Sequence, residues 1–277
     1  MSNHRARQLD RYTRGVAALL IAGIAMVVPA RAEDSASDLA KKLSNPVAAL
    51  VSVPFQLNYD RDIGPKDGGD RWLMNVQPVV PVSIDEKWNL ISRTILPIVS
   101  QSDIYPGAGS QSGIGDIVQS LFFSPKAPTA SGWIWGAGPV FLLPTGSDDL
   151  LTADKWAAGP TGVMLKQQGP WTYGALANHL WSFAGNNQRA SVNATFIQPF
   201  LSYTTPTAWT FGANTENTYD WEHQQWSVPL NVTVGKVTKF GDQLVSLTGG
   251  LRYWVDSPNS GPEGFGFRFV VTLLFPK

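Results

Sequence analysis

The stretch that decides the fold is GFGFRFVVTLLF, residues 264–275, in which large apolar side chains alternate with small or polar ones. Phe265, Phe267 and Phe269 belong to the apolar series, and Arg268 belongs to the polar one. Successive side chains of a β-strand point to opposite faces of the sheet. The segment therefore predicts a strand with one apolar and one polar face.

The same alternation, bounded by turn residues, continues backward through almost the whole chain. Residues 60–70, 102–112 and 145–154 form long polar gaps between strands, and residues 168–169 and 239–242 form tight ones. Long loops at one end, tight turns at the other and an even strand count are typical of bacterial transmembrane β-barrels. We therefore predict an all-β fold, an antiparallel up-and-down transmembrane β-barrel of about twelve strands with a short N-terminal helical segment. The predicted strands cover residues 49–59, 71–83, 88–101, 113–124, 132–144, 155–167, 170–184, 191–204, 208–220, 225–238, 243–255 and 264–275.

Eleven tryptophans favour a membrane barrel over a soluble β-sandwich, in which large aromatics sit mid-strand in the core. Here they fall near predicted strand ends, in two belts. Indole prefers the lipid headgroup region, so two aromatic girdles indicate a barrel in contact with outer-membrane lipid. The long-loop girdle contains Trp72, Trp156 and Trp226 with Trp181, Trp221 and Trp254, and the short-turn girdle contains Trp88, Trp133, Trp171 and Trp209 with Trp135.

The amino terminus predicts secretion. A basic stretch that contains four arginines precedes the apolar run of residues 15–28 and the small-x-small motif Ala30-Arg31-Ala32, so residues 1–32 are predicted to be a signal peptide. The apolar run is too short for a membrane helix, which needs about 20 residues. An integral membrane protein without such a helix has to be a barrel, so we expect it in the outer membrane.

Residues 33–48 lie between the signal peptide and the predicted barrel of residues 49–277. Ser35 and Asp38 form an N-capping environment, and Asn45-Pro46 ends the helical pattern. The segment is either a periplasmic tail, which we favour, or a short plug inside the barrel.

Composition excludes several classes of function. Residues 1–32 hold five of the 21 basic and one of the 21 acidic residues, so their removal leaves a net charge of −4. Without a run of Lys or Arg, nothing indicates a nucleic-acid partner. The absence of cysteine excludes disulfides and thiolate metal sites.

Prolines inside the predicted strands conflict with a regular closed sheet, because each lacks the N–H that a ladder uses. We expect β-bulges or irregular pairing at several of these positions. They are Pro54, Pro78, Pro81, Pro97, Pro139, Pro160, Pro199 and Pro229.

Strand parity predicts a charged cluster in the lumen. Glu216, Arg252 and Arg268 share the inward parity and should lie at similar depth, with Asn231 lower between them. We predict that Glu216 pairs with at least one of the arginines, as a structural cluster or as a selectivity constriction. Further lumenal residues are predicted to be Asn214 and, on the opposite wall, Arg93, Gln77 and Asn58.

Several long runs resemble a known family. QPVVPVSIDEKWNLISRTILPIVSQ (77–101), GPVFLLPTGSDDLLTADKWAAGPTGVMLKQQGPWTYGALANHLWSFAG (138–185) and YWVDSPNSGPEGFGFRFVVTLLFPK (253–277) are similar to the meta-pathway phenol-degradation family of transporter-like outer-membrane proteins. The resemblance spans nearly the whole mature chain. It implies passage of aromatic or other small hydrophobic compounds, and it implies no catalytic residues. Barrels of this kind usually end in an aromatic residue that the outer-membrane insertion machinery recognises, and we expect Phe275 to serve that role.

The residues themselves offer little chemistry. Ser182 is three positions from His179, and such positions in a strand face opposite ways, so the two cannot form a catalytic dyad. We expect no enzyme, no metal site and no cofactor. The predicted function is a passive route for small hydrophobic or aromatic solutes, and the alternatives are a closed structural barrel and a soluble periplasmic ligand-binding barrel.

Overall fold

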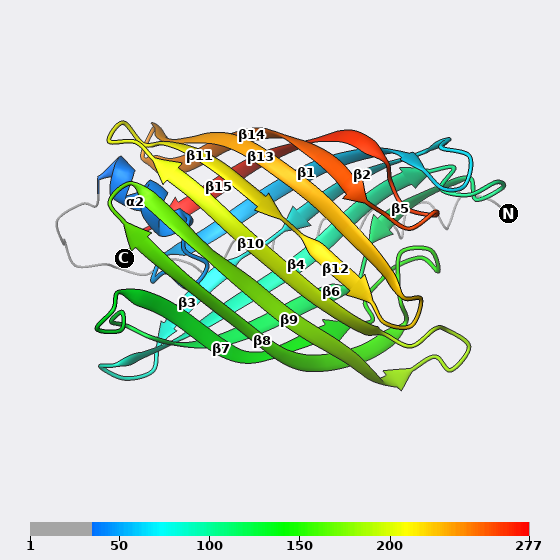
Figure 1. Cartoon of the computed structure of the whole chain (residues 1–277), viewed down its shortest axis with the longest axis horizontal. Helices are drawn as coiled ribbons and strands as arrows, with labels where there is room; N and C mark the ends of the chain where they lie inside the picture. Colours follow the sequence, from blue (N-terminus) through cyan, green and yellow to red (C-terminus); the bar gives the residue numbers. More distant parts are fainter. Residues whose placement is uncertain (1–34, 277) are drawn as a thin grey trace, which may run out of the picture. The chain divides into compact units, whose positions relative to one another are not determined.

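The computed structural model describes residues 35–276 and consists of one short helix and fifteen strands (Figure 1). The predicted signal peptide lies outside the described residues. In the part of the chain that is described, no helix is long and apolar enough to cross a membrane. The elements are α2 (Ala36–Leu43), β1 (Val51–Ile63), β2 (Gly69–Val76), β3 (Val79–Ser83), β4 (Trp88–Ser102), β5 (Ser110–Ile114), β6 (Ile117–Pro125), β7 (Trp133–Leu143), β8 (Lys155–Gln168), β9 (Trp171–Gly185), β10 (Asn193–Thr204), β11 (Trp209–Thr215), β12 (Asn217–Asp220), β13 (Gln225–Phe240), β14 (Gln243–Asp256) and β15 (Gly264–Phe275).

The strands form a closed antiparallel barrel. At three places around the barrel, one long strand is replaced by two shorter successive strands: β2 with β3, β5 with β6, and β11 with β12. The fifteen strands therefore occupy twelve strand positions, and the barrel is twelve-stranded. The sheet closes between the first and last strands, where Val51 lies opposite Phe275 and Tyr59 opposite Phe267. The predicted fold class and strand count are therefore confirmed.

Some of the prolines inside the predicted strands lie at or opposite the breaks in these three strand positions. The break between β2 and β3 contains Pro78, and the register of β13 against β14 shifts next to Pro229. Opposite Pro97, the chain passes Gly115, whose backbone lies so close that an added Cβ would be 2.9 Å from the proline Cγ. Irregular pairing at these positions is as predicted.

Four other prolines pair regularly with one neighbouring strand only. Pro54 lies opposite Thr272 and Pro199 opposite Ala175 without a shift of register. Pro139 and Pro160 lie opposite each other on neighbouring strands. On the other side of each strand the pairing is interrupted. Pro54 has no paired residue on β2 or β3, and Pro199 has none on β11 or β12. Pro139 is likewise skipped in the pairing of β7 with β6, and Pro160 in the pairing of β8 with β9, so irregular pairing at these positions is as predicted.

The apolar series of each strand faces outward. Phe265, Phe267 and Phe269 of β15 are 40–60% exposed, whereas Arg268 and Thr272, which have the opposite parity, are buried. Outward-facing tryptophans gather near both ends of the strands: Trp72 contacts Tyr59 and Phe267 at the long-loop end, and Trp88 contacts Trp135 at the short-turn end. A soluble ligand-binding barrel would carry its polar face outside, so that alternative does not fit.

The predicted helix is present. Ser35 caps it by accepting a hydrogen bond from the backbone N–H of Asp38, and the helix ends two residues before Asn45. Because Ser35 Oγ also hydrogen-bonds the Asp38 carboxylate, the pKa of Asp38 is lowered. α2 lies at the end of the barrel that carries the short turns (Figure 1).

The facing of β15 can be tested by placing a charge on each side. Phe269→Arg should lower the free energy of unfolding by roughly 2–4 kcal/mol, the cost of a cation on the lipid face near the bilayer midplane. Thr272→Arg, which points into the lumen, should cost much less. Urea unfolding in liposomes measures both, and equal costs would contradict the assigned facing.

Candidate functional site

Glu216 owes its position to a local defect in the sheet. Pro229 on β13 has no N–H to donate, and pairing with β13 is interrupted between Thr215 of β11 and Thr218 of β12. Glu216 lies in this gap, and its backbone N–H donates to the Pro229 carbonyl at 3.2 Å. The proline thus coincides with the break that carries the lumenal carboxylate.

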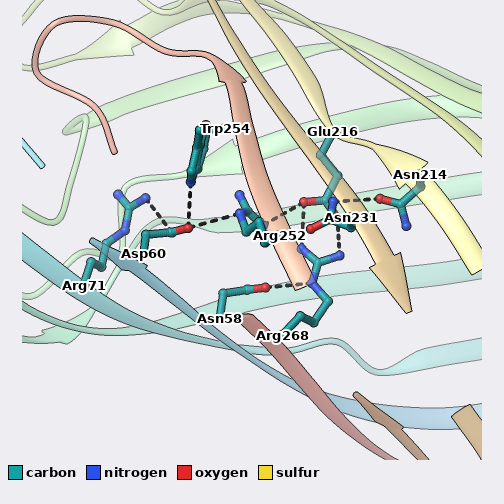
Figure 2. A network of polar contacts seen from close by, with 9 residues as sticks. All are labelled: Asn58, Asp60, Arg71, Asn214, Glu216, Asn231, Arg252, Trp254 and Arg268. Carbon is teal, nitrogen blue, oxygen red and sulfur yellow. Dashed lines mark hydrogen bonds and ion pairs between the residues drawn. The ribbon is translucent and has the colours of Figure 1, made fainter. Parts of the chain in front are cut away.

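Glu216 binds both predicted arginines (Figure 2). Arg268 donates from Nη1 to Oε1 and from Nη2 to Oε2, each at 2.8 Å, which is the paired geometry of a bidentate ion pair. Arg252 donates from Nη1 to Oε2 at 3.2 Å. The arginines are only 4% and 6% exposed, so the pairs are shielded from bulk water.

A second carboxylate, Asp60, extends the network toward the long loops (Figure 2). It is fully buried, accepts a hydrogen bond from Trp254 Nε1 at 2.9 Å, and lies 3.1 Å from Arg71 Nη2. Arg252 Nε lies 3.1 Å from Asp60 Oδ1, an ion pair without hydrogen-bond geometry, since this Nε has no hydrogen-bond partner. Trp254 also stacks on the Arg252 guanidinium at 4.7 Å.

Two of these residues, Trp254 and Asp60, differ from their predicted places. The assignment of Trp254 to the outer girdle is wrong, because Trp254 shares the parity of Arg252 and points inward. Asp60 lies in a predicted loop, because the predicted strand ends at residue 59, whereas β1 continues to Ile63. Continuing the inward parity of Asn58 by two residues would have identified it.

The predicted amides divide between two places. Asn58 accepts from Arg268 Nε at 2.7 Å and so belongs to the Glu216 network, and its predicted place on the opposite wall is wrong. Asn231 is fully buried and donates from Nδ2 to Asn214 Oδ1 at 2.9 Å. Gln77 lies apart from the network, where its Oε1 accepts from Arg93 Nη2 at 2.9 Å.

A cavity of about 330 Å³ lies in the lumen between this network and the short-turn end. Its wall includes Arg93, Gln77 and Asn214 together with Phe200, Val79 and Val270, so polar and apolar surfaces both face it. Residues 42–46 line it as well. The cavity therefore contacts the barrel wall and the N-terminal segment.

The N-terminal segment crosses the lumen. Leu39 and Ala40 of α2 are buried against Val237 and Leu274, which are inward-facing residues of β13 and β15. Val47, a few residues on, is buried against a different group on the far wall: Ile91, Phe122, Val163, Leu165 and Leu176. Gln167 of β8 also donates to the Lys41 carbonyl at 2.8 Å. Residues 36–50 thus contact strands on different sides of the barrel.

His179 and Ser182 lie on opposite sides of β9. His179 faces outward, where Nδ1 is 2.7 Å from Thr195 Oγ1 and Nε2 is 3.1 Å from Asn193 Oδ1. Ser182 Oγ instead accepts from the backbone N–H of Val192 at 3.0 Å. The two side chains do not form a catalytic pair.

Comparison with known proteins agrees with the fold. No family model and no curated protein matches the chain. An outer-membrane channel from Pseudomonas putida F1 is similar at 16% identity and a TM-score of 0.64, over 90% of this chain and 100% of the channel. The KdgM porin is similar at 13% identity and a TM-score of 0.45, over 81% of this chain and 99% of the porin. The outer membrane phospholipase of Salmonella typhi is similar at 9% identity and a TM-score of 0.47, over 88% of this chain and 99% of the phospholipase.

At 16% identity, the likeness to the Pseudomonas putida F1 channel concerns the fold alone. The closed barrel and its apolar outer face together define an outer-membrane β-barrel. Membership in the phenol-degradation family stays a prediction.

Proposed function

We propose that the protein is a passive route for small hydrophobic or aromatic solutes across the outer membrane. The observation that carries this proposal is the cavity of about 330 Å³ inside a barrel whose outer face is apolar. Small-molecule sites occupy roughly 300–1,000 Å³, so the cavity accepts a molecule of the size of one substituted aromatic ring. The similar barrel from Pseudomonas putida F1 is described as a channel, which agrees with this proposal.

The route contains two obstacles in series. Residues 36–50 cross the lumen at the short-turn end, and the network around Glu216 occupies it farther toward the long loops. We propose that the N-terminal segment is a plug that moves aside, and that the network sets the width and charge of the path.

These obstacles also favour a second candidate, a closed structural barrel. Small barrels are filled by their own side chains, and open channels are common at roughly sixteen or more strands. A twelve-stranded barrel lies between these cases. In a closed barrel the plug and the network would be permanent packing.

Transport separates the two candidates. A passive route should give discrete current steps in planar bilayers and swelling of proteoliposomes in phenylalanine, an aromatic zwitterion that crosses bare lipid slowly. Protein-free liposomes are the control. Absence of both signals from protein that migrates as a folded barrel in unboiled detergent gels would favour the closed barrel.

A further inference from the structure

The charges inside the lumen do not balance. Arg71, Arg252 and Arg268 each lie within 3.2 Å of a carboxylate oxygen of Asp60 or Glu216. Arg93 differs from them: within residues 35–276 its side chain hydrogen-bonds the neutral Gln77 and forms no ion pair, although Glu216 is near enough to attract it electrostatically. Four guanidinium groups therefore face two carboxylates, and the additional positive charge at Arg93 borders the cavity.

A cation at this position is costly unless something compensates it. Arginine stays protonated under physiological conditions, so burial cannot neutralise Arg93 as it could a lysine. Arg93 is half-buried beside the cavity, where a charge without an ion-pair partner is unfavourable, and a bound anion would relieve that cost. Gln77 accepts from one terminal nitrogen at 2.9 Å and so fixes the orientation of the guanidinium.

The rest of the cavity wall defines the remainder of the ligand. Phe200, Val79 and Val270 offer apolar surface, and Leu43 of α2 adds to it from the plug. Asn214 also lines the cavity; its Oδ1 accepts a hydrogen bond from Asn231, and its Nδ2 is a hydrogen-bond donor. A planar guanidinium matches a carboxylate bidentately, whereas the apolar residues suit a hydrocarbon body.

We infer that the cavity is a binding site for small carboxylates with an apolar body, held at Arg93, an inference that rests on the proposed function for its role in transport. The site selects the acid over its uncharged analogue. Gln77 is a positioning residue that orients the guanidinium, and the apolar wall selects such acids over short hydrophilic ones.

Isothermal titration calorimetry on the full barrel in detergent tests the site with three probes. Benzoate carries both features, benzamide lacks the charge, and acetate lacks the apolar body. We expect benzoate to bind more tightly than either. Arg93→Gln should weaken benzoate binding about 10- to 100-fold, the range for loss of a charge-assisted hydrogen-bonded pair, and should leave benzamide binding unchanged.

Matched variants distinguish local recognition from net charge or misfolding. Arg61→Gln removes the same charge from an exposed position and should leave benzoate binding unchanged. Arg93→Lys keeps the charge without the planar fork and should give an intermediate affinity, which also tests the site if Arg93→Gln does not fold. Equal affinities for benzoate and benzamide, or benzoate binding that is the same in the wild type and Arg93→Gln, would overturn the inference.

Binding and transport fail separately. Arg93-dependent benzoate binding in a protein that gives no current and no liposome swelling would support the carboxylate site and contradict the proposed route. Swelling in phenylalanine without selective benzoate binding would leave the route in place and overturn the carboxylate site.

Discussion

Deleting residues 36–46 should raise the single-channel conductance at least about threefold. A twelve-stranded barrel is wider than the small barrels that side chains fill completely, so removing the segment should leave an open lumen. The deleted stretch contains α2 and the turn that lines the cavity, and its removal opens the short-turn mouth. Planar-bilayer recording on refolded protein measures the change.

A point substitution tests the same closure without shortening the chain. Leu39 is fully buried against the barrel wall, so Leu39→Asp should displace α2 and raise the conductance in the same direction. Ser37→Asp adds the same charge at a more exposed position of the helix and serves as the control. Wild-type conductance in both the deletion and Leu39→Asp, with the barrel folded, would show that the segment does not limit the path.

The strands of the barrel and the direction that their side chains face are well predicted from the sequence, because the alternation of apolar and polar residues is a local property. Facing and strand count follow from side chains two residues apart, as in Phe267, Arg268 and Phe269. The helix is equally local, since Ser35 and Asp38 lie within one turn of each other. None of these features depends on how distant strands are aligned.

The lumenal site is less predictable, because depth depends on the register between strands. Asn58 and Arg268 are 210 residues apart in the chain and meet because β1 pairs with β15 in one particular alignment. The same closure brings Asp60 beside Trp254. Likewise, a tail differs from a plug only in whether residues 36–50 contact strands on different sides of the lumen. The helical pattern of the segment carries no information about where those strands lie.

Glu216→Gln should have the largest effect of any substitution in the lumenal network. It removes the carboxylate shared by Arg252 and Arg268 and leaves Arg268 without an ion-pair partner at a site that is 4% exposed. Breaking a buried ion pair from one side costs about 3 kcal/mol or more, so urea unfolding should occur at a clearly lower denaturant concentration. Glu263→Gln, at an exposed loop position, is the control for loss of one negative charge.

The same substitution should change ion selectivity, because the lumen loses one of the two carboxylates that offset its arginines. The reversal potential in a salt gradient should shift toward anion preference in Glu216→Gln and stay unchanged in Glu263→Gln. Replacing Arg252 and Arg268 together by alanine should widen the path, since two long side chains leave the lumen, and should speed liposome swelling in phenylalanine. If selectivity and swelling both stay at wild-type values in folded variants, the network does not lie on a permeation route, and the closed structural barrel becomes the better description.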